Sequence, residues 1–474
     1  MKKNTVIITL LFLLAFNSIS AQKQWTLKEC IDYALEHNIQ IKQQHLNLEL
    51  SKGTLLQSKM ALLPNISGSA NQVYNYGKTI DMFTNTFATK EVQSNNFYLS
   101  SGITLFDGLQ LLNTIKQNQY EAMASEYNLN KFENDISLNI ATAYLQILYN
   151  QELLEIAKNQ LEITKQQVER TKKLVDAGTL AKGSLLTMQS QAASEELQLV
   201  SAQNQLDLSY LTLAQLIDLD SVSDFNIEKP IIEITPDVSF FNEPSQIYNK
   251  SIGILPEVKS AELKLKSAYT GLSLARGRIS PSLSLRGSIG TGYSGASTRY
   301  NGFTENGVDF VGYTSDITHT TVVKPHIDYT VEKIPFNDQI NDNVNKSIGI
   351  YLTIPIFNNF QVKHTISSSK INVKNAAYNL ELTKNNLNKS IYQAYADAKA
   401  ALNKYFASVK AVEAMEESFK YTQQKFDVGM LNSIDYNDAK NKLIKAKSDL
   451  LQAKYEYIFR IKILDFYQGK PLPF

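Results

Sequence analysis

The sequence has little of several features that mark common functional classes. It has one cysteine, Cys30, in 474 residues, which excludes an intrachain disulfide, and its 47 Lys and Arg balance 46 Asp and Glu. A chain without a basic excess gives no indication of a nucleic-acid partner. The sequence also has no phosphate-binding loop, no dinucleotide fingerprint and no nucleophile elbow, and its five histidines show no metal-ligand spacing. We therefore expect no enzyme activity, no cofactor and no metal site.

Long apolar runs are also missing, apart from one at the N-terminus. Lys2 and Lys3 precede an apolar stretch over 6–16, and the small residues Ser20 and Ala21 follow it. This order is that of a secretory signal, so we predict a signal peptide over 1–21 and export of the remaining chain. No other apolar run reaches the length of a membrane helix, and any span made by the mature chain is therefore expected to be of β type.

Glycine and proline are both absent from four long stretches, which indicates helices because loops of that length rarely avoid both residues. The four stretches are 109–177, 184–229, 361–428 and 430–468. The first and third, of about 68 residues, would span on the order of 100 Å as helices. A globular domain has no room for such rods. Two shorter helical segments, 26–62 and 256–279, are expected to be interrupted at Gly53, Gly271 and Gly277.

These stretches carry a heptad pattern of apolar residues, which is typical of helices that wind around neighbours. The pattern recurs 251 residues later, and the glycine between the helices recurs with it, as Gly178 and Gly429. The positions are Ile147, Leu154, Leu161, Val168, Val175, Leu185, Ala192, Leu199, Leu206 and Leu213, which correspond to Ala398, Tyr405, Val412, Phe419, Phe426, Tyr436, Leu443, Leu450, Tyr457 and Leu464. The offset predicts an internal duplication of a helical hairpin.

Four other segments alternate apolar and small polar residues with period two, as half-buried strands do. They lie at 65–76, 97–105, 282–289 and 347–356, and each has about the length of a bilayer-spanning strand. One side is apolar and the other is small and polar, which suits lipid outside and a wet lumen inside. A soluble half-buried sheet would have the same local pattern, but the signal peptide and the rods favour membrane strands.

The elements divide the chain into two repeats. The first, 22–220, has a strand pair about 64–106 and a hairpin over 109–220; the second, 256–469, has a strand pair about 281–357 and a hairpin over 361–468. A connector is expected at 221–255, beside a barrel that the helical hairpins are predicted to form, and a C-terminal tail is expected at 470–474. The segment 294–345 is interpreted as a long surface loop, against a short one at 77–95.

Four strands cannot close a barrel, and an open sheet edge is not tolerated in lipid. Several copies must therefore share one barrel. Two copies would give eight strands, which side chains fill, whereas three would give twelve and leave an aqueous bore. The predicted fold is a mixed α and β membrane protein in which helical hairpins form an α-barrel and each chain adds four strands to a shared 12-stranded trimeric β-barrel.

The order of these elements resembles that of the TolC-like outer membrane efflux proteins, over nearly the whole mature chain. The likeness is carried by Leu27-Lys28-Glu29-Cys30-Ile31 with Ala34-Leu35-Glu36-His37-Asn38, by Leu63-Pro64 and Ser280-Pro281, by Leu105-Phe106-Asp107-Gly108 and Ile356-Phe357-Asn358-Asn359, and by the two helix–Gly–helix turns. The resemblance implies a homotrimer with its β-barrel in outer-membrane lipid and its α-barrel in the periplasm. It would be the exit duct of a tripartite efflux or secretion system, supplied by an inner-membrane transporter through a periplasmic adaptor.

The resemblance also implies that the glycine turns form the periplasmic tip that the adaptor contacts. The candidate residues are Gly178, Thr179, Leu180, Val428, Gly429, Met430 and Leu431. An exposed Leu or Met at such a tip favours a partner that covers it. A hairpin closed by its own apolar contacts would have the same residues, so both interpretations stay open.

Asp435 and Asp438 share one helix face just after the second turn. They match positions at which relatives carry an acidic ring at the entrance, and three copies would place six carboxylates around a narrow hole, which would bind cations. The alternative is that an acidic first turn complements the helix dipole, with Ser433 as the cap. In some relatives a salt bridge, here called the charged latch, joins an Arg just after the second turn to an Asp after the first and holds the entrance shut. The corresponding residues in this chain are Leu431 and Ser184, which carry no charge. Closure is therefore expected to depend on packing or on other polar bonds.

Another class of function remains as the alternative: a periplasmic coiled-coil scaffold or adhesin without a pore. The alternating strands argue against it. The residues do not distinguish a duct for small toxic solutes from a duct for a secreted polypeptide.

Overall fold

The structure, a computed structural model, describes residues 24–81, 83–85, 87–88, 91–219, 225–230, 243–470 and 472. The predicted signal peptide lies outside these residues, as do parts of the connector and of the tail. The described chain forms two compact units, and each takes segments from both sequence halves. We call residues up to Gly53, 119–267 and from Val373 onward the helical unit, and residues 54–118 and 268–372 the strand unit.

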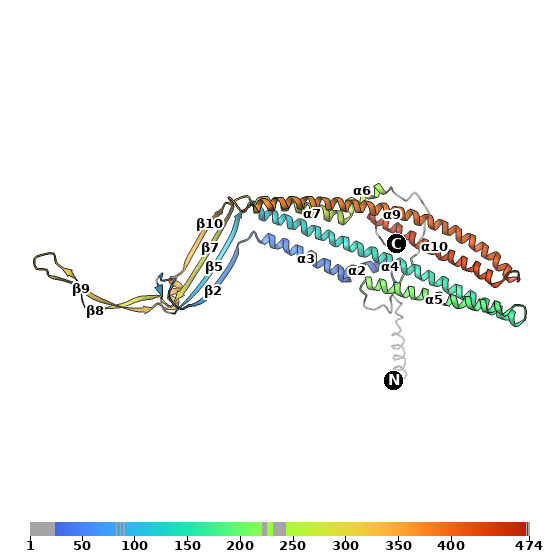
Figure 1. The fold of residues 1–474 in the computed structure, drawn as a ribbon, viewed down its shortest axis with the longest axis horizontal. Coiled ribbons are helices and arrows are strands. Elements are labelled where there is room, and N and C mark those ends of the chain that lie inside the picture. The colour runs from blue at the N-terminus through green and yellow to red at the C-terminus, as the bar shows by residue number, and fades with distance from the viewer. Residues whose placement is uncertain are drawn as a thin grey trace, which may run out of the picture. The chain divides into compact units, whose positions relative to one another are not determined.

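Two long hairpins make up most of the helical unit (Figure 1). The first consists of α4 (Gln110–Asp176) and α5 (Lys182–Leu216), and the second of α9 (Gln361–Asp427) and α10 (Ser433–Tyr467); α4 and α9 begin in the strand unit. The prediction of rods is confirmed, since α4 and α9 have 67 residues each. All of the heptad residues are buried or half-buried, so the apolar seam is the packing face. Among the described residues, no helix combines the length and the apolar character needed to cross a membrane.

Shorter elements pack onto these hairpins. They are β1 (Gln24–Trp25), α2 (Leu27–His37), α3 (Ile39–Met60), β6 (Asn226–Ile227), α6 (Pro244–Ile254) and α7 (Pro256–Gly277). Strands β1 and β6 pair in parallel, and the buried Tyr144 hydroxyl fixes them to α4 because it lies 2.6 Å from the carbonyl of Glu228 and 3.1 Å from that of Trp25. Cys30 of α2 is fully buried in the core that α2 forms with α4.

The helices differ from the predictions at four places. Residues 26–62 form two helices that meet at Asn38, whose side-chain oxygen accepts from the amides of Gln40 and Ile41 and so caps α3. Gly53 and Gly271 lie inside α3 and α7 without interrupting them. The predicted helix 184–229 ends at Leu216, because Asp218 takes a left-handed conformation with φ of 53°. Asp is one of the few residues that adopt this conformation without glycine's freedom, so the absence of Gly and Pro was misleading there.

The strand unit is built on a four-stranded antiparallel sheet. Its strands are β2 (Asn65–Asn75), β5 (Val92–Phe106), β7 (Ser282–Ser294) and β10 (Asn345–Thr353), in the order β10-β7-β5-β2 (Figure 1). All four predicted strands are confirmed, although β10 ends before Pro355. Within the described residues, β2 and β10 are edges that pair on one side alone.

The register places the four predicted apolar sides on one face of this sheet. Leu99 pairs with Gly68 and Ile289, and Leu285 pairs with Ile103 and Ile350; directly paired residues share a face. The apolar face holds Ile66, Ala70, Tyr74, Phe97, Leu99, Ile103, Leu283, Leu285, Ile289, Ile348, Ile350 and Leu352. Several of these side chains are largely exposed, for example Ile348 at 79%.

The opposite face carries a row of four serines across the strands: Ser67, Ser100, Ser288 and Ser347. The hydroxyl oxygens of Ser67 and Ser100 lie 2.9 Å apart, and those of Ser288 and Ser347 lie 2.7 Å apart. Arg286 is on the same face, with its guanidinium 5.2 Å from the ring centre of Tyr351. The sheet is therefore apolar on one side and polar on the other.

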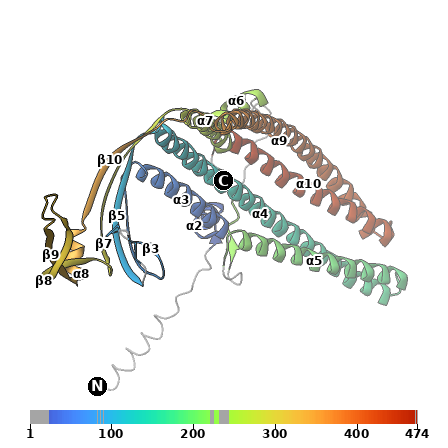
Figure 2. The same cartoon turned by 60° about the vertical axis from the view of Figure 1, so that its left-hand side comes forward.

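The segment 294–345 is not the loop that the sequence predicts. It forms a hairpin of β8 (Thr298–Tyr313) and β9 (Thr321–Lys333), followed by α8 (Phe336–Asp342), as Figure 2 shows. The register of the hairpin shifts three times, next to Gly302, Val308 and Gly312. Such bulges interrupt the period-two pattern by which a strand is recognised. A short pair, β3 (Thr79–Ile80) and β4 (Phe87–Ala88), likewise lies in the predicted short loop.

Candidate functional site

The two glycine turns have the same backbone geometry. Gly178 and Gly429 have φ of 74° and 78°, as a tight helix end requires. In each turn the glycine amide and the next amide donate to carbonyls three and five residues back: Gly178 to Val175 and Thr179 to Leu174, Gly429 to Phe426 and Met430 to Lys425, at 2.9–3.1 Å. This is the Schellman arrangement, in which glycine is favoured because it adopts positive φ without strain.

The predicted tip residues are exposed in both turns. Met430 is 80% exposed and Val428 70%, whereas Leu180 is 37% exposed and Leu431 half-buried. Thr179 turns its hydroxyl back to the carbonyl of Leu174, at 2.8 Å. The second turn therefore presents the larger apolar surface, and such surface is typical of a contact with a partner.

Asp435 and Asp438 lie near the start of α10, just after the second turn, and both are exposed. Each of them also contacts another side chain of its own chain. The helix cap is Asn432 and not Ser433, which is buried. The side-chain oxygen of Asn432 accepts from the amide of Asp435, and its side-chain nitrogen donates to the Asp435 carboxylate at 2.8 Å. Asp438 forms an exposed ion pair with Lys442 at 2.7 Å. Both carboxylates remain accessible to a cation.

An ion pair between the hairpins lies just behind the turns. Arg170 of α4 donates to the carboxylate of Asp427, the last residue of α9, and also to its backbone carbonyl at 3.1 Å. Both side chains are about two-fifths exposed. This ion pair connects the two hairpins close to the turns, whereas Leu431 and Ser184, the positions of the charged latch in some relatives, carry no charge.

A buried polar group joins three of the four long helices further from the turns. We call Gln160 and Thr164 of α4, Glu195 of α5 and Lys440 of α10 the interhelical polar cluster. The Lys440 ammonium lies 3.3 Å from the Glu195 carboxylate, and the two side chains are 3% and 2% exposed. Gln160 donates to Glu195 at 2.9 Å, and Thr164 contacts both charged groups. Gln191 extends the cluster, since its amide lies 2.8 Å from Glu195 and 3.0 Å from Asn441.

The cluster is electrostatically costly. Burial lowers the pKa of Lys440, and the charge and hydrogen bond of Glu195 oppose that shift. Burial also raises the pKa of the adjacent Tyr436 to about 12. The Tyr436 hydroxyl and the side-chain oxygen of Asn437 are buried without a hydrogen-bond partner in the part of the chain that the structure describes. Buried polar atoms without partners are rare in stable cores, so these two atoms add a desolvation cost at this level of the bundle.

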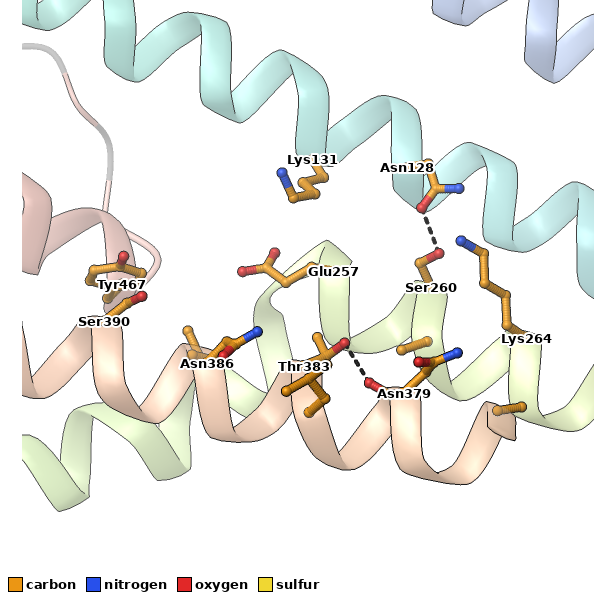
Figure 3. Close-up of a pocket in the computed structure, with 14 residues that line it drawn as sticks. Asn128, Lys131, Glu257, Ser260, Lys264, Asn379, Thr383, Asn386, Ser390 and Tyr467 are labelled. Carbon is orange, nitrogen blue, oxygen red and sulfur yellow. Dashed lines mark hydrogen bonds between the residues drawn. The ribbon is translucent and has the colours of Figure 1, made fainter. Parts of the chain in front are cut away.

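A polar pocket of about 560 Å³ lies among α4, α7, α9 and the end of α10 (Figure 3). Asn128 and Ser260 form a hydrogen bond of 2.6 Å across it. Glu257 faces the same space, and burial raises its pKa while the charge of Lys131 opposes the shift. The lining amides, hydroxyls and charges are those of a wet surface. No nucleophile with an adjacent base lines the described pocket.

Sequence reasoning missed the interhelical polar cluster, although part of the signal was present. Glu195 lies three residues after Ala192 and four before Leu199, which is the second core position of the heptad. Thr164 occupies the same position after Leu161. A charged residue at a core position indicates a specific polar contact, but its partner, Lys440, could not be inferred without knowing which helices are neighbours.

Comparison with known proteins identifies the family to which this chain belongs. A model of the outer membrane efflux protein family matches residues 30–218 and 248–460. Outer membrane protein TolC of Escherichia coli is 22% identical over 470 residues, 97% of this chain and 84% of the relative. Outer membrane efflux protein BepC of Brucella suis is 18% identical and covers 91% of this chain and 83% of its own. The chain belongs to the outer membrane efflux protein family.

Solved structures share the fold. The CusC structure superposes with a TM-score of 0.74 and 16% identity over 94% of this chain and 92% of CusC. The Campylobacter jejuni CmeC outer membrane channel gives 0.71 and 18% over 96% of this chain and 88% of CmeC. The relatives and neighbours are named as outer membrane proteins, efflux proteins and channels. Family membership therefore assigns the chain to the outer membrane and to efflux, with members that are channels and not enzymes.

Proposed function

We propose that the chain is one third of a passive exit duct, in which three copies share a 12-stranded β-barrel in the outer membrane and a helical barrel in the periplasm. The duct receives its substrate from an inner-membrane pump through a periplasmic adaptor. The proposal includes the two repeats, 22–220 and 256–469, with the connector between them.

The sheet is the observation that carries this proposal. Its four strands have one apolar face, one polar face with a serine row, and two edges, β2 and β10, that are unpaired in the described chain. An unpaired edge in lipid leaves backbone groups without partners, so other copies have to supply them. The apolar face suits lipid and the serine row suits a wet lumen.

The idea of a duplicated chain is supported by matched backbone geometry. Besides the glycine turns, the junctions into α4 and α9 agree: Gly108 and Leu109 have positive φ, as do Asn359 and Phe360, each 251 residues further on. In both junctions the second of these residues accepts the first helical hydrogen bond, from Asn113 and His364 at 2.9 Å. Unrelated hairpins would have no reason to share two consecutive residues with positive φ at the same place.

Closure of the periplasmic end is proposed to depend on polar contacts other than the charged latch. Arg170 with Asp427 and the interhelical polar cluster are two such contacts between the hairpins; Glu152 of α4 with Lys454 and Tyr455 of α10 is another. The exposed Val428 and Met430 are the proposed adaptor contact, and Asp435 and Asp438 the proposed acidic ring.

The channel proposal is tested by fractionating the outer membrane and recording ion flux in planar bilayers. We expect heat-modifiable oligomers and discrete conductance steps. A protein that stayed monomeric and never conducted would support the coiled-coil scaffold instead.

The acidic ring has its own test. Asp435→Ala with Asp438→Ala should weaken block of the pore by multivalent cations, because three copies would lose six carboxylates near the entrance. Glu417→Ala, on α9 with an exposed partner in Lys420, is the matched control and should leave block unchanged. If the double variant is blocked as strongly as the parent, the two aspartates serve the helix N-terminus alone.

A further inference from the structure

The helix–strand junctions of the strand unit carry an unbalanced charge. The four segments 54–64, 105–118, 268–281 and 354–372 contain one acidic residue, Asp107, although the whole chain is balanced. Their basic residues are Lys59, Lys116, Arg276, Arg278, Lys363 and Lys370. We call these six side chains the basic collar.

No residue that the structure describes neutralises the collar. All six side chains are exposed, and none forms an ion pair with a described residue. The Asp107 carboxylate accepts hydrogen bonds from the backbone amides of Gln110 and Leu111 at 2.9 Å. It therefore caps α4 and forms no ion pair with a described basic residue of the collar. Six like charges near one end of a sheet would repel each other unless anions lie beside them.

Exposed apolar side chains accompany these charges. Ile356 is 94% exposed, Phe357 73% and Ile279 62%. Phe360 is 63% exposed, and the Lys363 ammonium lies 5.2 Å from its ring centre. Basic and aromatic residues side by side are typical of the interface between lipid and water.

Three collar residues line one hollow, which we call the junction pocket. It has a volume of about 450 Å³ between the end of α7 and the start of α9. Arg278, Lys363 and Lys370 supply its charge, Ile279, Ile356 and Ile366 supply apolar wall, and none of its lining residues is acidic. The apolar row of β10 (Ile348, Ile350, Leu352) continues in step through Ile354 to Ile356, which is part of the pocket wall.

We propose that the junction pocket binds the headgroup of an anionic phospholipid of the periplasmic leaflet, with the acyl chains along the apolar row of β10. Guanidinium and ammonium groups are the usual partners of a phosphate, and the apolar row gives the chains a surface that a soluble anion would not use. The inference depends on the proposed function, because it needs the sheet to be in a membrane.

The test uses the purified full chain and measures lipid affinity by native mass spectrometry and by thermal shift. The variant Arg278→Gln, Lys363→Gln, Lys370→Gln should bind phosphatidylglycerol on the order of 100-fold more weakly at low salt, since each basic side chain near anionic lipid contributes roughly a fivefold factor. Lys165→Gln, Lys172→Gln, Lys182→Gln removes the same charge from exposed positions of the first hairpin and should retain the affinity. Arg278→Lys, Lys363→Arg, Lys370→Arg should also retain it, which excludes misfolding as the cause.

The outcomes separate lipid from other ligands and from the channel itself. Equal affinity of the parent for phosphatidylglycerol and phosphatidylcholine, or unchanged affinity in the glutamine variant, overturns the proposal. An equal thermal shift with inorganic phosphate alone also overturns it, in favour of a soluble anion. If the parent protein conducts ions but has no lipid preference, the lipid-binding proposal is wrong and the channel proposal stands. If it never conducts ions, the proposed function is wrong, whatever the lipid measurement shows.

Discussion

At the scale of single residues, the Lys440–Glu195 pair is an ion pair whose two side chains are almost fully buried in the helical unit. Both charges are removed from water, so their attraction and hydrogen bonds mainly offset the cost of desolvation. A buried pair of this kind contributes little net stability when intact. It becomes expensive when one partner is lost, and it thereby fixes how α4, α5 and α10 align.

The pair gives a prediction about stability. Lys440→Met should lower the free energy of unfolding by about 3–5 kcal/mol, because Glu195 then remains buried and unpaired. Adding Glu195→Gln should restore most of the loss, since glutamine keeps its bonds to Gln160 and Gln191 without the charge. Lys442→Met breaks an exposed pair with Asp438 and should cost less than about 1 kcal/mol. Chemical denaturation followed by circular dichroism measures all three, and equal costs for Lys440→Met and Lys442→Met would contradict the argument.

His326 on β9 provides a prediction about pH. Its imidazole lies 2.8 Å from the Asp309 carboxylate and 3.3 Å from that of Asp328. The hydrogen bond to Asp309 and the two negative charges raise the pKa of His326 above its ordinary value of 6.5. The β8–β9 hairpin should therefore be most stable below pH 6.5 and lose this stabilisation as the pH rises through the raised value.

Hydrogen exchange of the β8–β9 amides measures the effect. Protection should fall between mildly acidic and alkaline pH in the parent, and His326→Gln should remove that dependence. Lys324 also faces Asp309, at 3.9 Å, so Lys324→Gln is the control, which should shift the overall protection and keep the pH dependence.

At the scale of elements, the two glycine turns form the ends of the hairpins. Gly178→Ala or Gly429→Ala should destabilise each hairpin by about 1–2 kcal/mol, because alanine is strained at positive φ. An added methyl group meets no other atom within 4 Å at either position, so the expected loss comes from the backbone conformation and not from a clash. Gly53→Ala is the matched control: Gly53 has open space too but lies inside α3, so alanine should stabilise it by about 0.5–1 kcal/mol. Thermal unfolding of the three variants distinguishes the two signs.

The elements also explain what could be predicted from the sequence. The four sheet strands were predictable because each keeps a period-two alternation over most of its length, and the register then places the apolar sides together. The β8–β9 hairpin was not, since its three register shifts break that alternation. The long helices were predictable from the absence of Gly and Pro, and the same rule failed at Asp218. The position of Asp435 and Asp438 on one helix face just after the turn follows from their spacing, and their role as an acidic ring stays a prediction. The Lys440–Glu195 contact, in contrast, depends on the packing of helices far apart in sequence.

At the scale of the whole molecule, the sheet order leads to a test of the assembly. In one chain β5 and β7 separate β2 from β10, which places the two edges about 14 Å apart at three strand spacings. A disulfide needs α-carbons about 4.4–6.8 Å apart. Cysteines on β2 and β10 can therefore join only when the strands belong to different copies.

The experiment first replaces Cys30 by serine. It then combines Ser67→Cys on β2 with Ser347→Cys, Gly349→Cys or Tyr351→Cys on β10. Three positions on β10 are used because the structure of one chain does not fix the register of β2 against β10 of the next copy. Under mild oxidation the best-matched pair should give covalent dimers and trimers and no larger species, since three copies close a 12-stranded ring. The control, Ser67→Cys with Ser100→Cys, links residues that pair directly within one chain and should leave a monomer on a denaturing gel. A series that stops at the dimer would indicate an eight-stranded barrel, and one that continues beyond the trimer would indicate an open chain of sheets; either result would refute the trimeric duct.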